Sequence, residues 1–335
     1  MIKKVILILL LLLLVNFVFF GHAVQVVPLP DLVNPRKIAV DDNQLYIAEK
    51  IPVFIYSLKD FKLIKKFGKE GEGPREFKSR ITRMELQPGY IFINSSGKVS
   101  YFTKDGTFIK EFRTVSPDLR LKPFGDRFAG ERMTSENSTL YNVVGIYDSS
   151  LKKIAEVYRQ EREVQVGGKG TKVFAHPMPY YICDDKLFVV TGPDFVIDVL
   201  DKTAKKQYTV TYDYKRIKVT AEDKKRVMNH LETDPNTKPY LEMLKPIIFP
   251  DYFPAIRNYY VADGKVYVLT YKEENGKSEW LVFDIKGKFL KQFFLPYHYM
   301  NPVDEYPAAV KNEKLYQLIE NEDTEAWELH ITGIK

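Results

Sequence analysis

Short apolar runs with alternating polar positions follow one another through most of the chain, separated by turns rich in Asp, Asn, Gly and Lys. In a typical pair, residues 55–60 are followed by residues 63–67, and the same arrangement returns at residues 101–106 and 108–112. Alternation with a period of two residues indicates half-buried strands. Asp-Gly and Lys-Gly pairs between such runs favour hairpin turns, because glycine adopts positive φ angles at little steric cost.

A further short strand precedes each of these hairpins, as at residues 45–47, 90–92 and 265–268, and most of these strands follow a turn that joins them to an earlier strand. Each unit therefore contains four antiparallel strands, which is the composition of a propeller blade. Tyr46 and Ile91 are 45 residues apart, which agrees with the roughly 40–45 residues of a four-stranded blade. Six units are found, and their centres are near Tyr56, Tyr101, Tyr147, Leu200, Phe283 and Leu329. The sequence predicts an all-β, six-bladed propeller.

One interval is too long for a single blade, because Leu200 and Phe283 are 83 residues apart. It contains Thr220-Ala-Glu-Asp223, a pattern typical of a helix N-terminus with Thr as the cap. We predict a helix from there to about Leu231, within an insertion at residues 215–254 that lies over one face between blades 4 and 5. The alternative is a boundary between two smaller domains. The preferred domain organisation is a signal peptide at 1–23 and one propeller at 24–335.

The glycine-rich segment at residues 67–77 fits a connection between blades, with Gly68, Gly71, Gly73, Pro74 and Phe77 in a Gly-x-Gly-x-Gly-Pro-x-x-Phe-like arrangement. In this segment, and again at residues 249–256 and 263–268, the chain resembles the six-bladed NHL-like β-propellers of exported bacterial proteins. The Gly-Pro connection occurs once rather than in every blade. The resemblance implies the fold better than the function, because propellers include enzymes, binding proteins and scaffolds.

The N-terminus has the features of an export signal. Lys3 and Lys4 precede an apolar run at residues 5–20, and Gly21-His22-Ala23 offers small residues for cleavage. The run is shorter than the roughly 20 residues of a comfortable membrane span. We expect cleavage after Ala23 and a periplasmic or extracellular protein; the alternative is an uncleaved anchor through residues 5–20.

The amino-acid composition excludes several classes of protein. With 45% hydrophobic and 14% aromatic residues the chain is not of the disordered type, and one cysteine excludes a disulfide scaffold. The 22 Tyr and 22 Phe recur at matching points of the repeat, and we interpret most of them as blade-packing residues. We assign Tyr46, Phe92, Tyr267 and Tyr316 to inner strands.

The net charge does not indicate nucleic-acid binding. Loss of Lys3 and Lys4 with the signal peptide lowers the formal charge from +6 to +4, which is too small an excess of positive charge for a nucleic-acid-binding surface. We expect a monomer.

Catalytic motifs are sparse. The sequence has no Gly-x-Ser-x-Gly elbow, and the histidines after residue 23 form neither His-x-His nor His-x-x-x-His pairs. His176, before Pro177 in a predicted loop, is the best-placed catalytic candidate. Whether the chain is an enzyme is left open, and the catalytic residues are not identified.

We predict no cofactor and no tightly bound metal. Propellers similar to this chain include lactonases with an axial calcium ion, and oxygen ligands from Asp41, Asn94, Asp184 and Asp263 would suit calcium. We interpret these residues as turn formers instead, since Asp and Asn stabilise turns through backbone hydrogen bonds.

Aromatic residues and arginines gather in the predicted insertion and just after it. Tyr and Arg are favoured in binding sites because they combine a large contact area with a polar group. We therefore predict that the face under the insertion binds an unknown protein or small molecule; packing of the insertion is the competing explanation. The candidate ligand-binding residues are Arg75, His176, Tyr252, Arg257 and Tyr259. The preferred function is an exported binding module, and the alternatives are a lactonase-like hydrolase or lyase using the central channel, or an envelope scaffold.

Overall fold

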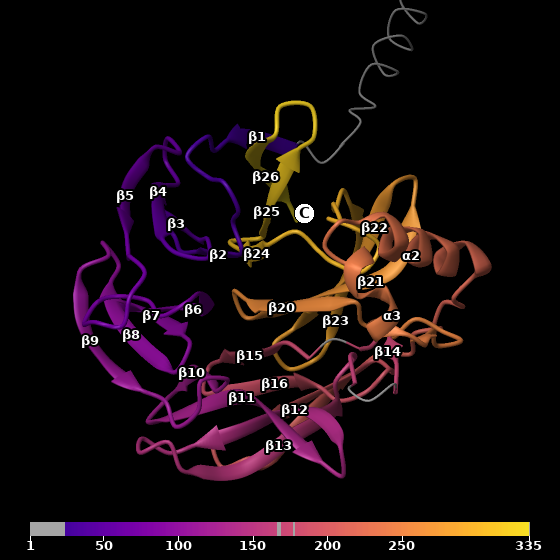
Figure 1. Cartoon of the computed structure of the whole chain (residues 1–335), viewed down its shortest axis with the longest axis horizontal. Helices are drawn as coiled ribbons and strands as arrows, with labels where there is room; N and C mark the ends of the chain where they lie inside the picture. The colour runs from indigo at the N-terminus through magenta and orange to yellow at the C-terminus, as the bar shows by residue number, and fades with distance from the viewer. Residues whose placement is uncertain (1–23, 166–168, 177, 335) are drawn as a thin grey trace, which may run out of the picture.

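The computed structural model describes residues 24–165, 169–176 and 178–334, so the predicted signal segment at 1–23 lies outside the described residues. Within these ranges, six four-stranded antiparallel sheets stand around a central axis, as Figure 1 shows. The prediction of a six-bladed, all-β propeller is confirmed. None of the helices in these ranges is both long and apolar enough for a membrane span.

The blades are numbered in chain order, each from its innermost to its outermost strand. Blade 1 comprises β2 (Lys37–Val40), β3 (Gln44–Ala48), β4 (Val53–Ser57) and β5 (Leu63–Phe67). Blade 2 comprises β6 (Ile81–Gln87), β7 (Tyr90–Ser95), β8 (Lys98–Thr103) and β9 (Phe108–Arg113). Blade 3 comprises β10 (Arg120–Phe124), β11 (Arg127–Glu136), β12 (Thr139–Tyr147) and β13 (Lys153–Glu161). Blade 4 comprises β15 (Tyr180–Cys183), β16 (Lys186–Val190), β17 (Val196–Leu200) and β18 (Lys206–Thr211). Blade 5 comprises β20 (Asn258–Ala262), β21 (Lys265–Glu274), β22 (Lys277–Asp284) and β23 (Phe289–Leu295). Blade 6 comprises β24 (Ala308–Lys311), β25 (Lys314–Asn321), β26 (Ala326–Gly333) and β1 (Val24–Pro28).

The last blade is built from both ends of the described chain. Strand β1 pairs with β26 in antiparallel register, from Val24 opposite Thr332 to Pro28 opposite Glu328. The outermost strand of blade 6 thus comes from the segment that precedes blade 1. The sequence pattern indicates strands at Lys314–Tyr316 and Trp327–His330 for this blade but none at residues 24–28. The pairing binds the segment that leads into blade 1 to the last blade by backbone hydrogen bonds and so closes the ring.

The apolar core lies between the blades rather than at the centre. Six clusters of buried side chains among the described residues each join two neighbouring blades. On β3, Leu45 and Ile47 pack toward blade 6, whereas Tyr46 and Ala48 pack toward blade 2. Successive strand residues point to opposite faces, so a middle strand between two blades needs apolar residues throughout. Because the apolar clusters lie between neighbouring blades, they do not fill the central axis of the ring.

The aromatic residues of the repeat pack between blades as predicted. Tyr46, Phe92 and Tyr267 are fully buried and Tyr316 is nearly so. They lie on β3, β7, β21 and β25, the second strand of each blade, and so within its inner half as expected. Most of the innermost strands are short, with four residues each in β2, β15 and β24, and the hydrophobic pattern did not reveal them individually.

Four antiparallel strands return the chain to the face of the ring where the blade began. All outer-to-inner connections between blades therefore lie on one face, which we call the loop face; the opposite one is the turn face. The connection at residues 68–80 is one of these, and its Phe77 is fully buried in the cluster between blades 1 and 2. Gly68 has a φ angle of +91°, and a Cβ there would clash with the Phe77 ring.

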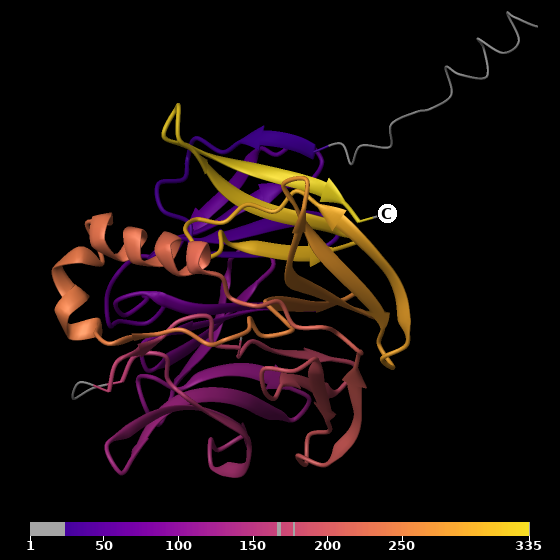
Figure 2. The same ribbon diagram turned by 90° about the vertical axis from the view of Figure 1, so that its right-hand side faces the viewer.

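The insertion lies on the loop face between β18 and β20, and its helices project from the ring in Figure 2. Helix α2 (Ala221–Thr233) begins with the predicted capping box, in which Thr220 and Asp223 each accept a hydrogen bond from the backbone of the other. Val227 and Leu231 of α2 pack against Val173 of the preceding loop. The remaining elements are η1 (Lys238–Tyr240), α3 (Leu241–Leu244) and a parallel pair of β14 (Thr171–Lys172) with β19 (Ile247–Ile248).

Candidate functional site: the central channel

The six innermost strands enclose a central channel with a cavity of about 550 Å³. Each of these strands contacts the next around the ring, from β2 through β6, β10, β15, β20 and β24 back to β2. All six run in the same direction, since each begins at the loop face. A residue early in such a strand therefore lies near the loop face, and a late residue lies near the turn face.

Blades 1 to 3 carry six ionisable side chains into the channel wall: Lys37, Arg83, Glu85, Arg120, Lys122 and Glu131. Lys37 and Arg120 are the first residues of β2 and β10, so the charged cluster lies in the loop-face half of the channel. Further toward the turn face the same wall offers Val40 and Leu86. The channel thus has a polar end and an apolar end.

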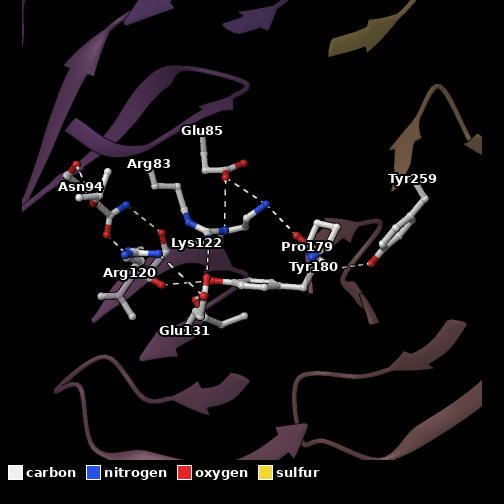
Figure 3. Close-up of polar contacts among 12 residues, drawn as sticks. Arg83, Glu85, Asn94, Arg120, Lys122, Glu131, Pro179, Tyr180 and Tyr259 are labelled. Carbon is white, nitrogen blue, oxygen red and sulfur yellow. Dashed lines mark hydrogen bonds and ion pairs between the residues drawn. The ribbon is translucent and has the colours of Figure 1, made fainter. Parts of the chain in front are cut away.

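The two carboxylates hold most of the cations in place (Figure 3). Glu131 lies 3.0 Å from the guanidinium of Arg83 and 3.8 Å from that of Arg120. Glu85 lies 3.0 Å from the ammonium of Lys122 and 3.9 Å from the guanidinium of Arg83. Such partly buried ion pairs depend on their geometry, since each charge has lost part of its hydration.

Tyr180 and Lys122 connect blades 3 and 4 in both directions. Lys122 donates a hydrogen bond of 2.7 Å to the Tyr180 carbonyl, and the Tyr180 hydroxyl donates one of 3.1 Å to the Arg120 carbonyl. The guanidinium carbon of Arg83 lies 4.7 Å from the centre of the Tyr180 ring, a cation–π distance. These contacts fix the orientation of the cationic groups before any ligand arrives.

Burial shifts the proton equilibria of this cluster. Burial, opposed by Glu85 and reinforced by Arg83, lowers the pKa of Lys122 to about 8. Lys37 is exposed at the loop-face mouth of the channel, and its pKa is also lowered, by desolvation and then by the neighbouring Arg83 and Arg120. Burial raises the pKa of the Tyr181 hydroxyl, which therefore keeps its proton and can donate a hydrogen bond.

Asn94 is not a turn residue, which corrects the interpretation made from sequence. It is buried within β7, where its side chain accepts a 2.8 Å hydrogen bond from the Leu121 amide and donates one of 2.9 Å to the Leu121 carbonyl. Leu121 lies between Arg120 and Lys122, so Asn94 fixes the strand that carries both cations (Figure 3). The other residues considered for calcium do lie in turns. Asp41 accepts hydrogen bonds from the backbone amides of Asn43 and Gln44. Asp184 and Asp263 have positive φ angles.

Carboxylates do not converge on a metal position in this wall. Across the described ranges, no group of three or more His, Cys, Asp or Glu side chains could hold a metal ion. Glu85 and Glu131 each lie beside two cations instead. The arrangement is therefore suited to electrostatic recognition by the cations.

Four of the five residues singled out from sequence lie in loop-face connections. His176 and Tyr252 line one cavity of about 460 Å³ between blade 3 and the insertion. His176 makes a 2.6 Å hydrogen bond with the Tyr158 hydroxyl, and burial lowers its pKa. Tyr252 is 46% exposed. The structure thus brings these two residues to one place.

The other three residues lie elsewhere. Arg257 stacks against the Tyr299 ring, 3.5 Å from its centre, and pairs with Glu305 at 3.4 Å. Arg75 lies in the first connection and its guanidinium faces Phe108. Tyr259 is fully buried, and its hydroxyl donates to the carbonyls of Pro179 and Phe188, both at 2.9 Å. Tyr259 therefore supports the channel wall from behind, as Figure 3 shows, and does not face a cavity.

Sequence reasoning did not identify the channel residues. Lys37, Arg83, Arg120 and Lys122 are spread over more than eighty residues, and each lies in a short strand without a local motif. The signal that could have found them is positional: each lies at or near the start of the strand that opens a blade. Using it requires the exact start of every innermost strand.

Comparison with known proteins gives the fold alone. No family model matches the chain, and no curated protein matches it. A crystal structure of a protein named "putative exported protein" from Bacteroides fragilis superposes with a TM-score of 0.55 at 13% identity, covering 94% of this chain and 98% of that one. A member of the DUF4221 family from Bacteroides vulgatus gives 0.52 at 12% identity, covering 93% and 96%. Both likenesses extend over the whole ring.

Proposed function

We propose that this chain is an exported binding module that takes a small molecule into its central channel. The observation that carries the proposal is the convergence of polar groups from three blades on a cavity of about 550 Å³. Small-molecule sites typically have volumes of about 300–1,000 Å³, apolar walls and a few oriented polar groups. The channel has the volume and the oriented polar groups of such a site, and blades 4 to 6 supply one apolar wall.

Catalysis receives less support from this wall. A hydrolase or lyase needs a nucleophile or a general base that can accept a proton. The two channel carboxylates lie in ion pairs with Arg83, Arg120 and Lys122, and the Lys122 ammonium is held between Glu85 and the Tyr180 carbonyl, so these groups already have partners within the wall. Binding is therefore the function that the geometry favours, and a substrate-panel assay would detect an activity if there were one.

The proposal is tested by blocking the channel. Ala309 lines it from β24, so Ala309→Phe would fill part of the cavity, whereas Ala221→Phe places the same ring on the exposed first turn of α2 as a control. A thermal-shift screen of a metabolite library should give compounds that stabilise the wild type and Ala221→Phe but not Ala309→Phe. Circular dichroism checks that both variants fold.

Compounds that stabilise Ala309→Phe as strongly as the wild type would exclude the channel as their site. A crystal structure of the wild type with such a compound gives an independent location, so the proposal stays testable even if Ala309→Phe fails to fold.

The cavity beside the insertion is a second candidate site. It is lined by aromatic side chains and prolines, including Tyr158, Phe249, Tyr252 and Pro254, which suits an apolar ligand or a peptide. Tyr252→Ala removes its most exposed ring, and Arg257→Ala alters the neighbouring pocket. If binding of a verified partner is unchanged in both variants, this location is excluded.

Export is the remaining part of the proposal. It is supported by the signal-like pattern of residues 1–23 and by the name of the similar protein from Bacteroides fragilis. Expression of the full chain in a bacterial host, followed by fractionation and N-terminal sequencing, should give a periplasmic or secreted protein that begins at Val24. Recovery of the intact N-terminus in the membrane fraction would favour the anchor at residues 5–20 instead.

A further inference from the structure

The channel contains hydrogen-bond donors that the protein itself does not use. Among the described residues, the Lys37 ammonium makes no hydrogen bond and has no carboxylate within 4.0 Å. Arg120 approaches Glu131 only at 3.8 Å, beyond hydrogen-bond distance, and its side chain is 38% exposed. These two cations contrast with Arg83 and Lys122, which both lie 3.0 Å from a carboxylate oxygen.

The charges of the cluster do not cancel. Four cationic side chains face two carboxylates, and the closest pairs are Arg83 with Glu131 and Lys122 with Glu85. Lys37 and Arg120 are left as the surplus. Both begin their strands, at the end of the channel that opens toward the loop face. Unpaired cations at the mouth of a channel attract and concentrate an oppositely charged ligand.

The wall opposite these cations is different. Blades 4 to 6 contribute Tyr181, Tyr260, Val261 and the segment Ala308–Val310, with no charged side chain among the residues lining the cavity. The Tyr181 hydroxyl makes no hydrogen bond to another described residue and remains protonated, so it can act as a donor. A ligand between the two walls would meet cations on one side and aromatic or aliphatic groups on the other.

We infer that the channel ligand is a small organic anion, whose carboxylate or phosphate binds Lys37 and Arg120 and whose apolar body packs against blades 4 to 6. This inference rests on the proposed binding function of the channel. Arginine recognises both groups through paired N–H donors, and lysine contributes a point charge. Glu85 and Glu131 keep Arg83 and Lys122 in place beneath the anion.

Calorimetric titration with simple probes tests the charge requirement. The probes are benzoate and phenyl phosphate, with benzyl alcohol as the neutral compound of similar shape and inorganic phosphate as the anion without an apolar body. We expect one or both aromatic anions to bind, and each to bind at least tenfold more tightly than benzyl alcohol, because a charge-assisted hydrogen bond strengthens binding by about that factor. Which anion binds more tightly distinguishes carboxylate from phosphate recognition.

Variants then locate the binding. Lys37→Gln and Arg120→Gln should each weaken anion binding about tenfold or more, and Arg120→Lys should recover part of the loss. Lys59→Gln removes the same charge from an exposed turn between β4 and β5 and should leave the affinity unchanged. Inorganic phosphate should bind more weakly than phenyl phosphate if the apolar wall contributes.

The outcomes separate the two proposals. If screening compounds require an open channel but bind equally well in Lys37→Gln and Arg120→Gln, the channel binds ligands and the anion inference is wrong. If no compound distinguishes Ala309→Phe from the wild type, the binding function of the channel is itself wrong. Equal binding of benzyl alcohol and the aromatic anions would also overturn the inference.

Discussion

The two halves of the channel wall have the same backbone and opposite chemistry. Blades 1 to 3 contribute six charged side chains, whereas blades 4 to 6 contribute tyrosines and aliphatic residues. In both halves the second and third strands carry the packing between blades. The comparison teaches that the repeat fixes where a channel residue stands but not what it is.

The largest effect is expected from breaking the charged half. Glu131→Gln leaves Arg83 and Arg120 without their shared carboxylate and should lower the free energy of unfolding by about 2–3 kcal/mol, since a partly buried cation loses its partner. Urea unfolding measures this loss. Glu136→Gln is the control, because Glu136 lies at the exposed end of the same strand and pairs with Arg159 at the surface. Equal losses in the two variants would contradict a buried network.

Lys122 should make the charged half sensitive to pH. Its folded-state pKa of about 8 lies below the ordinary lysine value of 10.5, so between these values the unfolded chain binds more protons than the folded chain. The free energy of unfolding should therefore increase with pH in this window, relative to Lys122→Met, by about 3 kcal/mol. Unfolding curves of both proteins from pH 7 to 10.5 measure the difference, and parallel pH profiles would show that Lys122 does not titrate in this window.

A smaller effect is expected where the two halves meet. Tyr180→Phe removes the hydrogen bond from blade 4 to the Arg120 carbonyl and should cost about 1 kcal/mol of unfolding free energy. Tyr260→Phe is the matched change within the uncharged half, where the hydroxyl lies 3.4 Å from that of Tyr297. It should cost less, since that contact is longer and therefore weaker. The reverse order in thermal unfolding would show that the tyrosine half depends more on its hydroxyl groups.

The smallest effect on stability is expected at Lys37. Its ammonium has no carboxylate within 4.0 Å among the described residues, and Arg83 and Arg120 lie nearby. Lys37→Gln should therefore change the unfolding free energy by no more than about 0.5 kcal/mol. A large loss of stability in urea unfolding would assign Lys37 a structural role and remove the contrast with Glu131.

Much of the fold could be predicted because its signals are local. Residues close together in sequence define the hairpin that contains Leu63–Phe67, the interblade connection that contains Phe77 and the capping box of Thr220. The innermost strands were harder to define. Lys37–Val40 has only four residues and begins with a charge, so neither its length nor its pattern distinguishes it from a loop.

The candidate site could not be predicted for a related reason. His176 and Tyr252 were found from their residue types, and the structure brings them to one cavity, but Tyr259 is buried. Its sequence context of tyrosines and an arginine does not distinguish a ligand contact from a core residue. Asn94 was misread in the same way, because an Asn-Ser-Ser segment suits a turn as well as a strand end.

The number of blades, the hairpins within them, the helix of the insertion and the aromatic packing between blades can all be inferred from the amino-acid sequence. These features follow from periodicity, turn chemistry and capping, which act over a few residues. Only the tertiary structure decided that β1 completes blade 6 and that cations from blades 1 to 3 face tyrosines from blades 4 and 5 across one channel. Both results require ring closure, which places residues from distant parts of the chain together at a single axis.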